Sequence, residues 1–276
     1  MVKKKDKELF SVKDKIVVIT GGSGVLGSTI AKGFLSSGSK VIILDRNKEK
    51  MERKLKELKG YSKQVFGYVC NVLKEDDIIS ANKQIVKRFK RIDVLLNAAG
   101  GQVPGTTLRA DQNVFALGYE NFNKVTELNL GGTVLPTFII GETMAKQKSG
   151  SIINISSMAT FRSITRVVGY SAAKAAVDNF TRWMAMEMAL KFGDGIRVNA
   201  IAPGFFITDQ NRKILTTKNG NLTKRAKLIL HQTPFKRFGK PDELIGIALF
   251  LSSEASNFIT GTVIPVDGGF SMFSGV

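Results

Sequence analysis

Short apolar runs alternate with amphipathic segments along this chain of 276 residues. The run at 15–20, which is closed by glycines and rich in β-branched residues, predicts a central parallel strand covered on both faces. Similar runs at 40–44, 64–69, 93–96, 151–155 and 196–200 are separated by segments with helical spacing at 47–58, 75–89, 119–147 and 170–192. This alternation predicts an α/β fold: a Rossmann-type doubly wound parallel sheet of about seven strands, in a single domain over residues 1–276.

Two connections, 100–118 and 203–241, are much longer than the others. Both follow the carboxyl ends of predicted strands, where ligands bind in sheets of this kind, and loops of this length are usually functional. We therefore expect them to form a substrate pocket and its lid, with a small amphipathic helix near 223–231. The charged residues 1–13 are expected to form a flexible arm.

The composition favours a soluble protein that works in a reducing compartment. Cys70 is the only cysteine, which excludes an internal disulfide. The charged N-terminus resembles no signal peptide, and no stretch approaches 18 uninterrupted apolar residues. We expect a cytoplasmic protein without membrane association. The His, Cys and acidic residues show no metal-ligand spacing, so no metal is expected.

The formal net charge of +18 leaves open a nucleic acid, an acidic protein or an anionic substrate as partner. The basic residues are spread over 48–63, 83–91, 146–148 and 212–240 and are not gathered in one stretch. This distribution favours solvated surface charge over a nucleic-acid site, so no nucleic-acid partner is expected.

A glycine-rich loop, Gly22-x-Gly24-x-x-Gly27, joins the first predicted strand to a helix. Such a loop lets the backbone approach a pyrophosphate and directs helix N-terminal amides toward it. Asp45 ends the next strand, 21 residues beyond Gly24, where an acid can bind a ribose diol and repel a 2′-phosphate. The pattern favours NAD as cofactor, whereas Arg46 keeps NADP open as the less favoured choice.

Tyr170 and Lys174 lie four residues apart in a helical segment and therefore share one face. A tyrosine titrates near pH ~10, and lowering its pKa to about 7 requires roughly 4 kcal/mol of preferential stabilisation of the phenolate. A lysine charge about 5 Å away supplies about 3 kcal/mol, and an oxidised nicotinamide ring would add a second positive charge. Because this spacing is common on exposed helices, its meaning depends on the cofactor site.

Several motifs together resemble those of the short-chain dehydrogenase/reductase family, in that family's order. They are the 20–27 loop, Asn97-Ala98-Ala99-Gly100, Asn129, Ser156-Ser157, Tyr170-x-x-x-Lys174, Arg197-Val198-Asn199, Pro203-Gly204 with Thr208, and Asp267-Gly268-Gly269. The resemblance covers the sequence from about residue 13 to residue 276. Two positions depart from the family pattern: Val25 stands where a glycine is usual, and Asn71 where an aspartate usually meets the adenine.

The resemblance implies a catalytic set of Asn129, Ser157, Tyr170 and Lys174. In it Tyr170 exchanges the proton, and Ser157 hydrogen-bonds the reacting oxygen. Lys174 would hold the nicotinamide ribose and lower the pKa of Tyr170, while the Asn129 region positions a water. The residues implied at the cofactor are Gly21, Ser23, Gly24, Val25, Leu26, Gly27, Asp45, Asn71, Val72, Asn97, Ala98, Gly100, Tyr170, Lys174, Pro203, Gly204 and Thr208.

Within the family the sequence most resembles the D-mannonate oxidoreductases (fructuronate reductases) of the short-chain type, through segments 99–107, 156–162, 202–212 and 267–276. This implies an NAD-dependent enzyme that interconverts D-mannonate and D-fructuronate, and a homotetramer. A sugar-acid substrate calls for arginine forks and amides. The expected substrate-binding residues are Gln102, Ser157, Arg162, Asn211 and Arg212, with Arg162 or Arg212 at the carboxylate; Arg166 and Gln210 lie in the same segments.

Three alternatives stay open at this point. A 3-oxoacyl-[acyl-carrier-protein] reductase would share the fold and the catalytic set, and so would another sugar or polyol dehydrogenase. A non-catalytic dinucleotide sensor that binds nucleic acid is a remote third, because such proteins generally lack the tyrosine or the lysine.

Overall fold

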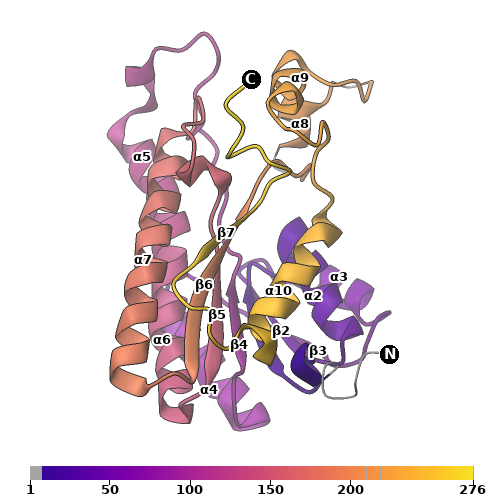
Figure 1. Ribbon diagram of the computed structural model, residues 1–276, viewed down its shortest axis with the longest axis vertical. Coiled ribbons are helices and arrows are strands. Elements are labelled where there is room, and N and C mark those ends of the chain that lie inside the picture. The colour runs from indigo at the N-terminus through magenta and orange to yellow at the C-terminus, as the bar shows by residue number, and fades with distance from the viewer. Residues whose placement is uncertain (1–7, 209–210, 218, 276) are drawn as a thin grey trace.

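Seven parallel strands form one sheet in the order β3-β2-β1-β4-β5-β6-β7 (Figure 1). The computed structural model describes residues 8–208, 211–217 and 219–275. The strands are β1 (Ile16–Thr20), β2 (Lys40–Asp45), β3 (Val65–Val69), β4 (Val94–Asn97), β5 (Gly150–Ile155), β6 (Ile196–Pro203) and β7 (Val263–Val266). The order reverses between β1 and β4, so the predicted doubly wound Rossmann-type fold is confirmed.

Helices cover both faces of the sheet, α2, α3 and α10 on one face and α4, α6 and α7 on the other (Figure 1). The helices are α2 (Val25–Ser36), α3 (Lys48–Leu58), α4 (Glu75–Phe89), α5 (Tyr119–Thr126), α6 (Gly132–Gln147), α7 (Val168–Phe192), α8 (Arg212–Leu215), α9 (Lys224–His231) and α10 (Ile245–Ser252). A π-helical turn, Glu127–Gly131, joins α5 to α6 within the segment predicted as one long helix. Short 3-10 helices lie at Val114–Leu117, Met158–Thr160, Pro241–Leu244 and Glu254–Ser256.

The core consists of two apolar layers, one on each face of the sheet. In β1, Val17 and Ile19 point toward α2 and α10, whereas Ile16 and Val18 point toward α4, α6 and α7. Strand side chains alternate between faces, so a strand buried on both sides must be apolar throughout. The continuous β-branched run seen in the sequence is the consequence of this double burial.

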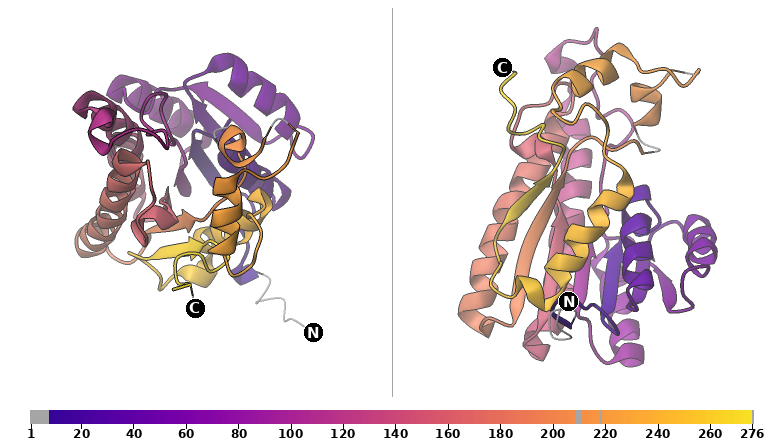
Figure 2. Two further views of the ribbon diagram at one scale, coloured as in Figure 1. Left: turned by 90° about the horizontal axis from the view of Figure 1, so that it is seen from above. Right: turned by 45° about the vertical axis from the view of Figure 1, so that its right-hand side comes forward.

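The segments expected to form a pocket and lid lie beyond the carboxyl ends of the strands. Helices α8 and α9 stand at the top of Figure 1, above the sheet, and the right-hand view of Figure 2 shows them at the same end. The segment between β4 and α5 reaches the same end of the molecule. None of the helices in the described ranges has both the length and the apolar character needed to span a bilayer.

Part of the predicted N-terminal arm is packed against the domain. Val12 is 2% exposed and belongs to the core, and its carbonyl accepts a hydrogen bond from Ser39 Oγ at 2.6 Å. The expectation of a flexible arm is therefore wrong for the part near Val12, because this residue buries apolar surface. Residues 1–7 lie outside the described part of the protein.

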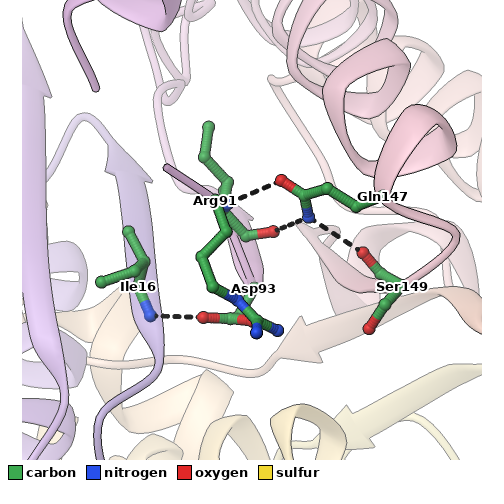
Figure 3. A network of polar contacts seen from close by, with 6 residues as sticks. Ile16, Arg91, Asp93, Gln147 and Ser149 are labelled. Atoms are coloured by element: carbon green, nitrogen blue, oxygen red, sulfur yellow. Dashed lines mark hydrogen bonds and ion pairs between the residues drawn. The ribbon is translucent and has the colours of Figure 1, made fainter. Parts of the chain in front are cut away.

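A polar network joins the start of β1 to the residues that precede β4 and to the end of α6 (Figure 3). The Ile16 N–H of β1 donates to the Asp93 carboxylate at 2.7 Å, and Arg91 Nε donates to the other carboxylate oxygen at 2.7 Å. The Gln147 amide at the end of α6 accepts from the Ile92 N–H at 2.9 Å and donates to the Ile92 carbonyl at 2.8 Å. The network satisfies backbone groups that strand pairing leaves free.

Replacing Asp93 with alanine is expected to lower the free energy of unfolding by about 1–3 kcal/mol, because the buried Ile16 N–H loses its acceptor. Chemical denaturation measures this loss. Arg91→Ala is the matched control, since it removes this half-buried ion pair, with side chains 58% and 7% exposed, but leaves the Asp93 carboxylate as acceptor for the Ile16 N–H. Equal losses in the two variants would contradict a role for the buried N–H.

Candidate active site

The loop between β1 and α2 forms one wall of a cleft at the carboxyl edge of the sheet. Gly21 has a φ of +62°, and a Cβ there would lie 2.7 Å from the Ala99 Cα, so only glycine fits this close approach. Gly24 caps α2, and the first turn of α2 holds no acidic residue. Free amides and the positive end of the helix dipole therefore face the cleft, which suits a phosphate.

The pairing of β1 with β4 places a second loop beside the first one. Thr20 is paired with Asn97 in the register of these strands. The Thr20 Oγ1 accepts hydrogen bonds from the Ala98 N–H at 3.1 Å and the Ala99 N–H at 3.2 Å. The hydroxyl at the end of β1 thus holds the loop after β4 against the glycine loop.

Asp45 ends β2 on the other side of the glycine loop. Its carboxylate accepts hydrogen bonds from the Ser23 N–H at 3.3 Å and the Asn47 N–H at 3.1 Å. The exposed side chains of Arg46 and Lys50 line the same part of the cleft. Two cations and one carboxylate therefore lie where a ribose would bind, and the sequence analysis had noted only one of these cations.

The cleft is a cavity of about 340 Å³ that brings together most of the residues expected at the dinucleotide. Those that line it are Gly21, Gly24, Val25, Leu26, Gly27, Asp45, Asn71, Val72, Ala98, Gly100, Tyr170, Lys174 and Thr208. The wall also includes Cys70, whose thiol has a pKa raised to about 12 by burial. The protonated thiol is a packing group at neutral pH.

Four of the expected cofactor residues do not line this cavity. Asn97 is buried, and its Nδ2 donates to Asn154 Oδ1 and to Thr137 Oγ1, each at 2.9 Å, so it joins β4 to β5 and α6. Ser23 and Pro203 are buried beside the cavity, and Gly204 lines the adjoining cavity described below. The Ser23 and Asn97 side-chain oxygens have no hydrogen-bond partner among the described residues.

The π-helical turn positions Asn129 beside α7, the helix that carries Tyr170 and Lys174. Its Oδ1 accepts from the Gly101 N–H at 2.9 Å, and its Nδ2 donates to the carbonyls of Gly101 at 2.9 Å and Val125 at 2.8 Å. A Cβ on Gly100 would lie 2.7 Å from Asn129 Oδ1 and 3.5 Å from Lys174 Nζ. A glycine at 100 is therefore required for Asn129 and Lys174 to converge.

Lys174 is 3% exposed, and its ammonium donates to the Ile155 carbonyl at 2.7 Å. Burial lowers the pKa of Lys174 to about 8, although the negative charge of Asp178 acts in the opposite direction. Asp178 lies one turn further along α7, is 5% exposed, and accepts a hydrogen bond from Ser156 Oγ. This buried carboxylate is not among the residues predicted from the sequence, although its i, i+4 relation to Lys174 points to it.

The protein environment raises the pKa of the Tyr170 phenol. Burial is the main cause, and a side-chain hydrogen bond with Ser157 acts in the opposite direction. Lys174 Nζ lies 5.7 Å from the centre of the tyrosine ring, and at a pKa near 8 it is only partly charged in mildly alkaline solution. The sequence predicts that Lys174 lowers the pKa of Tyr170, but the structure gives the opposite direction: burial raises this pKa, and the hydrogen bond with Ser157 opposes the rise only in part.

A second cavity of about 700 Å³ opens from the first. Gly101, Gln102, Tyr170 and Thr208 line both cavities, so the phenol stands at their junction. The walls of the second cavity come from the segment after β4, from the turn after β5 and from the segment after β6. Ser157, which accepts a hydrogen bond from the Ala159 N–H at 3.1 Å, also lines the second cavity.

The expected substrate residues divide between this cavity and other places. Gln102, Ser157 and Asn211 line it. Arg162 instead donates to the Phe273 carbonyl of the C-terminal segment, and the exposed Arg212 is not among the lining residues. Gln210 lies outside the described residues.

The arginines that do line the second cavity are Arg109, Arg166 and Arg225, and no carboxylate lines it among the described residues. Arg109 forms an ion pair with Asp111 at 3.3 Å. Arg166 lies in a segment that the sequence predicts near the site, whereas Arg225 of α9 was not predicted there. The predicted amphipathic helix near 223–231 was a signal for this residue, but it did not distinguish Arg225 from the neighbouring surface lysines.

The arrangement joins a dinucleotide-shaped cleft to a substrate cavity, with a phenol, an ammonium and a serine hydroxyl at the junction. Two hydroxyls that converge on one oxygen suit proton exchange coupled to transfer of a hydride. The arrangement suits an NAD(P)-dependent oxidoreductase that acts on CH–OH groups.

Sequence similarity to known proteins shows which family the chain belongs to. Residues 23–271 match the family model described as enoyl-(acyl carrier protein) reductase. A Bacillus subtilis (strain 168) protein described as the uncharacterized oxidoreductase UxuB is 41% identical over 271 residues, which are 95% of this chain and 96% of that protein. The FabG 3-oxoacyl-[acyl-carrier-protein] reductase of Thermotoga maritima is 34% identical over 258 residues, covering 94% and 98% of the two proteins.

A solved structure agrees with these matches. A Haemophilus influenzae protein, provisionally described as a D-mannonate oxidoreductase and crystallised with NAD bound, superposes with a TM-score of 0.88 at 39% identity. The match covers 96% of this chain and 98% of that protein. The chain belongs to the short-chain dehydrogenase/reductase family, and it is an oxidoreductase that uses NAD(P).

Proposed function

We propose that this enzyme interconverts D-mannonate and D-fructuronate with NAD as cofactor. The observation that carries the proposal is the charge of the second cavity, which has three arginines and no carboxylate among its described lining residues. A cavity of one sign attracts a ligand of the opposite sign. A hexonic acid supplies one carboxylate together with hydroxyls for the amides of the wall, such as Gln102 and Asn211.

Tyr170 is the proposed proton donor for reduction of the ketone and the acceptor for oxidation of the alcohol. The bound dinucleotide supplies or accepts the hydride and, in its oxidised form, carries a positive charge on the ring. The Ser157 hydroxyl hydrogen-bonds the same substrate oxygen and stabilises the charge that develops there. Lys174 holds the ribose beside the phenol and favours the phenolate through its charge.

Asp45 supports NAD as the cofactor. Two backbone N–H groups hold its carboxylate at the rim of the cleft, where it would hydrogen-bond the ribose hydroxyls and repel a 2′-phosphate. Arg46 and Lys50 would attract a 2′-phosphate, but the charges of their exposed side chains are screened by solvent. We therefore expect NADH to be preferred over NADPH.

A spectrophotometric assay of NADH and NADPH oxidation tests the proposal, with D-fructuronate and an acetoacetyl thioester as substrates. We expect turnover of D-fructuronate with NADH as the preferred cofactor. Turnover of the thioester alone would overturn the sugar-acid assignment in favour of an acyl reductase, the function of the Thermotoga relative. If D-fructuronate is reduced with NADPH in preference to NADH, only the role of Asp45 in selecting NAD would be overturned.

A further inference from the structure

We propose that Arg166 and Arg225 form the subsite for the substrate carboxylate, and that the carboxylate links the lid helix α9 to the turn that precedes α7. Both arginines line the second cavity together with Tyr170. The inference rests on the proposed sugar-acid function and names the residues that bind the carboxylate of the acid. It replaces Arg162 and Arg212, which the sequence had suggested.

Hydrogen bonds place the Arg225 guanidinium against Thr165, the residue that precedes Arg166. Arg225 Nη1 donates to Thr165 Oγ1 at 3.0 Å, and its Nη2 lies 3.4 Å from the Thr165 carbonyl. Thr165 is the sequence neighbour of Arg166, whose own carbonyl accepts from the Leu108 N–H at 3.0 Å. The bond from Leu108 therefore fixes the backbone at Arg166, while Thr165 anchors the Arg225 side chain of α9.

The pair has charge that the described part of the protein does not neutralise. Neither Arg166 nor Arg225 makes an ion pair with a described residue, whereas Arg109 does so with Asp111. Partial burial and the positive charge of Arg166 both lower the pKa of Arg225. Two like charges in one cavity repel each other, and a bound carboxylate removes that repulsion.

The guanidinium groups also have hydrogen-bonding capacity to spare. A guanidinium carries five N–H donors, and Arg225 directs only two bonds to Thr165. The remaining donors suit the two oxygens of a carboxylate, which prefers a fork of this kind. In a hexonic acid the carboxylate is several bonds away from the reacting carbonyl, so its subsite must lie to one side of Tyr170.

The subsite is tested by comparing D-fructuronate with D-fructose, in which a hydroxymethyl group replaces the carboxylate. In the Arg225→Gln and Arg166→Gln variants we expect kcat/KM for D-fructuronate to fall about 10- to 100-fold. The rate with D-fructose should hardly change, so the preference for the acid is lost. Arg225→Lys should recover part of it, because the charge is kept without the fork. Lys227→Gln, on the same helix and exposed, is the matched control and should behave as wild type.

A binding measurement separates failure of the subsite from failure of the proposed reaction. At constant ionic strength, D-gluconate should raise the thermal midpoint of the wild-type protein more than uncharged sorbitol, and Arg225→Gln should remove this difference. If the difference is seen but D-fructuronate is not turned over, the subsite stands and the proposed reaction falls. If Arg225→Gln keeps its preference for the acid, or if Lys227→Gln loses as much, the subsite is overturned.

Discussion

Replacing Tyr170 with phenylalanine is expected to lower kcat by a factor of about 10² to 10⁴ in both directions of the reaction. The variant keeps the ring and loses the hydroxyl that would exchange the proton at the junction of the two cavities. Steady-state kinetics measure the loss. Binding of NADH, followed by its fluorescence, should change little, because most of the cleft wall is provided by backbone and by other side chains.

Tyr119→Phe is the matched control for this experiment. Tyr119 lies at the start of α5, is 78% exposed and lines neither cavity. We expect wild-type kinetics from this variant. If Tyr170→Phe kept more than about a tenth of the wild-type kcat, the proton would have to come from another group, and the role proposed for Tyr170 would be wrong.

Replacing Lys174 with methionine is expected to reduce kcat/KM by about 10²-fold, because the charge that favours the phenolate is lost. It should also change how stability depends on pH. The pKa of Lys174 is lowered to about 8 in the folded protein, from an ordinary value of 10.5. Between these two values the unfolded state binds more protons at this group than the folded state.

The sign of the effect follows from this difference in bound protons. Below pH 8 burying the ammonium costs free energy, and the cost is relieved as the pH rises from about 8 to 10.5. The free energy of unfolding of the wild-type protein should therefore gain up to about 3 kcal/mol over this range relative to Lys174→Met. Denaturant titrations of both proteins at about pH 7 and pH 10 measure the difference, and groups common to both proteins cancel.

Asp178→Asn gives an independent check on the assignment to Lys174. The Asp178 charge holds the pKa of Lys174 up, so its removal should lower that pKa further. The range over which stability rises with pH should then begin at a lower pH than in the wild-type protein. A pH dependence that is the same in wild type and Lys174→Met would show that the buried ammonium is not its source.

The pKa of Tyr170 shows why spacing alone was insufficient. The four-residue spacing correctly predicts that the phenol and the ammonium are neighbours on α7, because helix periodicity is a local property. The pKa depends on burial, and Tyr170 packs against the turn after β5, against Phe205 after β6 and against Phe270 near the C-terminus. Coulomb energy estimated from spacing left out this desolvation, which acts in the opposite direction.

Asn97, which belongs to a recognised motif, likewise has a position that the sequence predicts and side-chain contacts that only the tertiary structure determines. Its place at the end of β4 is predicted from the apolar run that precedes it. Its amide, however, is used for bonds to Asn154 and Thr137, which are 57 and 40 residues away in the sequence. A strand end provides both buried and cavity-facing positions, and the neighbouring strands and helices select between them.

Local rules account for the strands, the helices and the backbone-lined part of the cleft. Apolar runs specify strands buried on both faces, and glycines specify the loop that approaches Ala99, because each depends on residues close in sequence. The arginines of the second cavity follow no such rule. Arg162 is held by a residue 111 positions away and Arg225 by one 60 positions away. Which guanidinium lines the second cavity therefore depends on how α9 and the C-terminal segment fold over the sheet. A linear pattern carries no information about contacts at that separation.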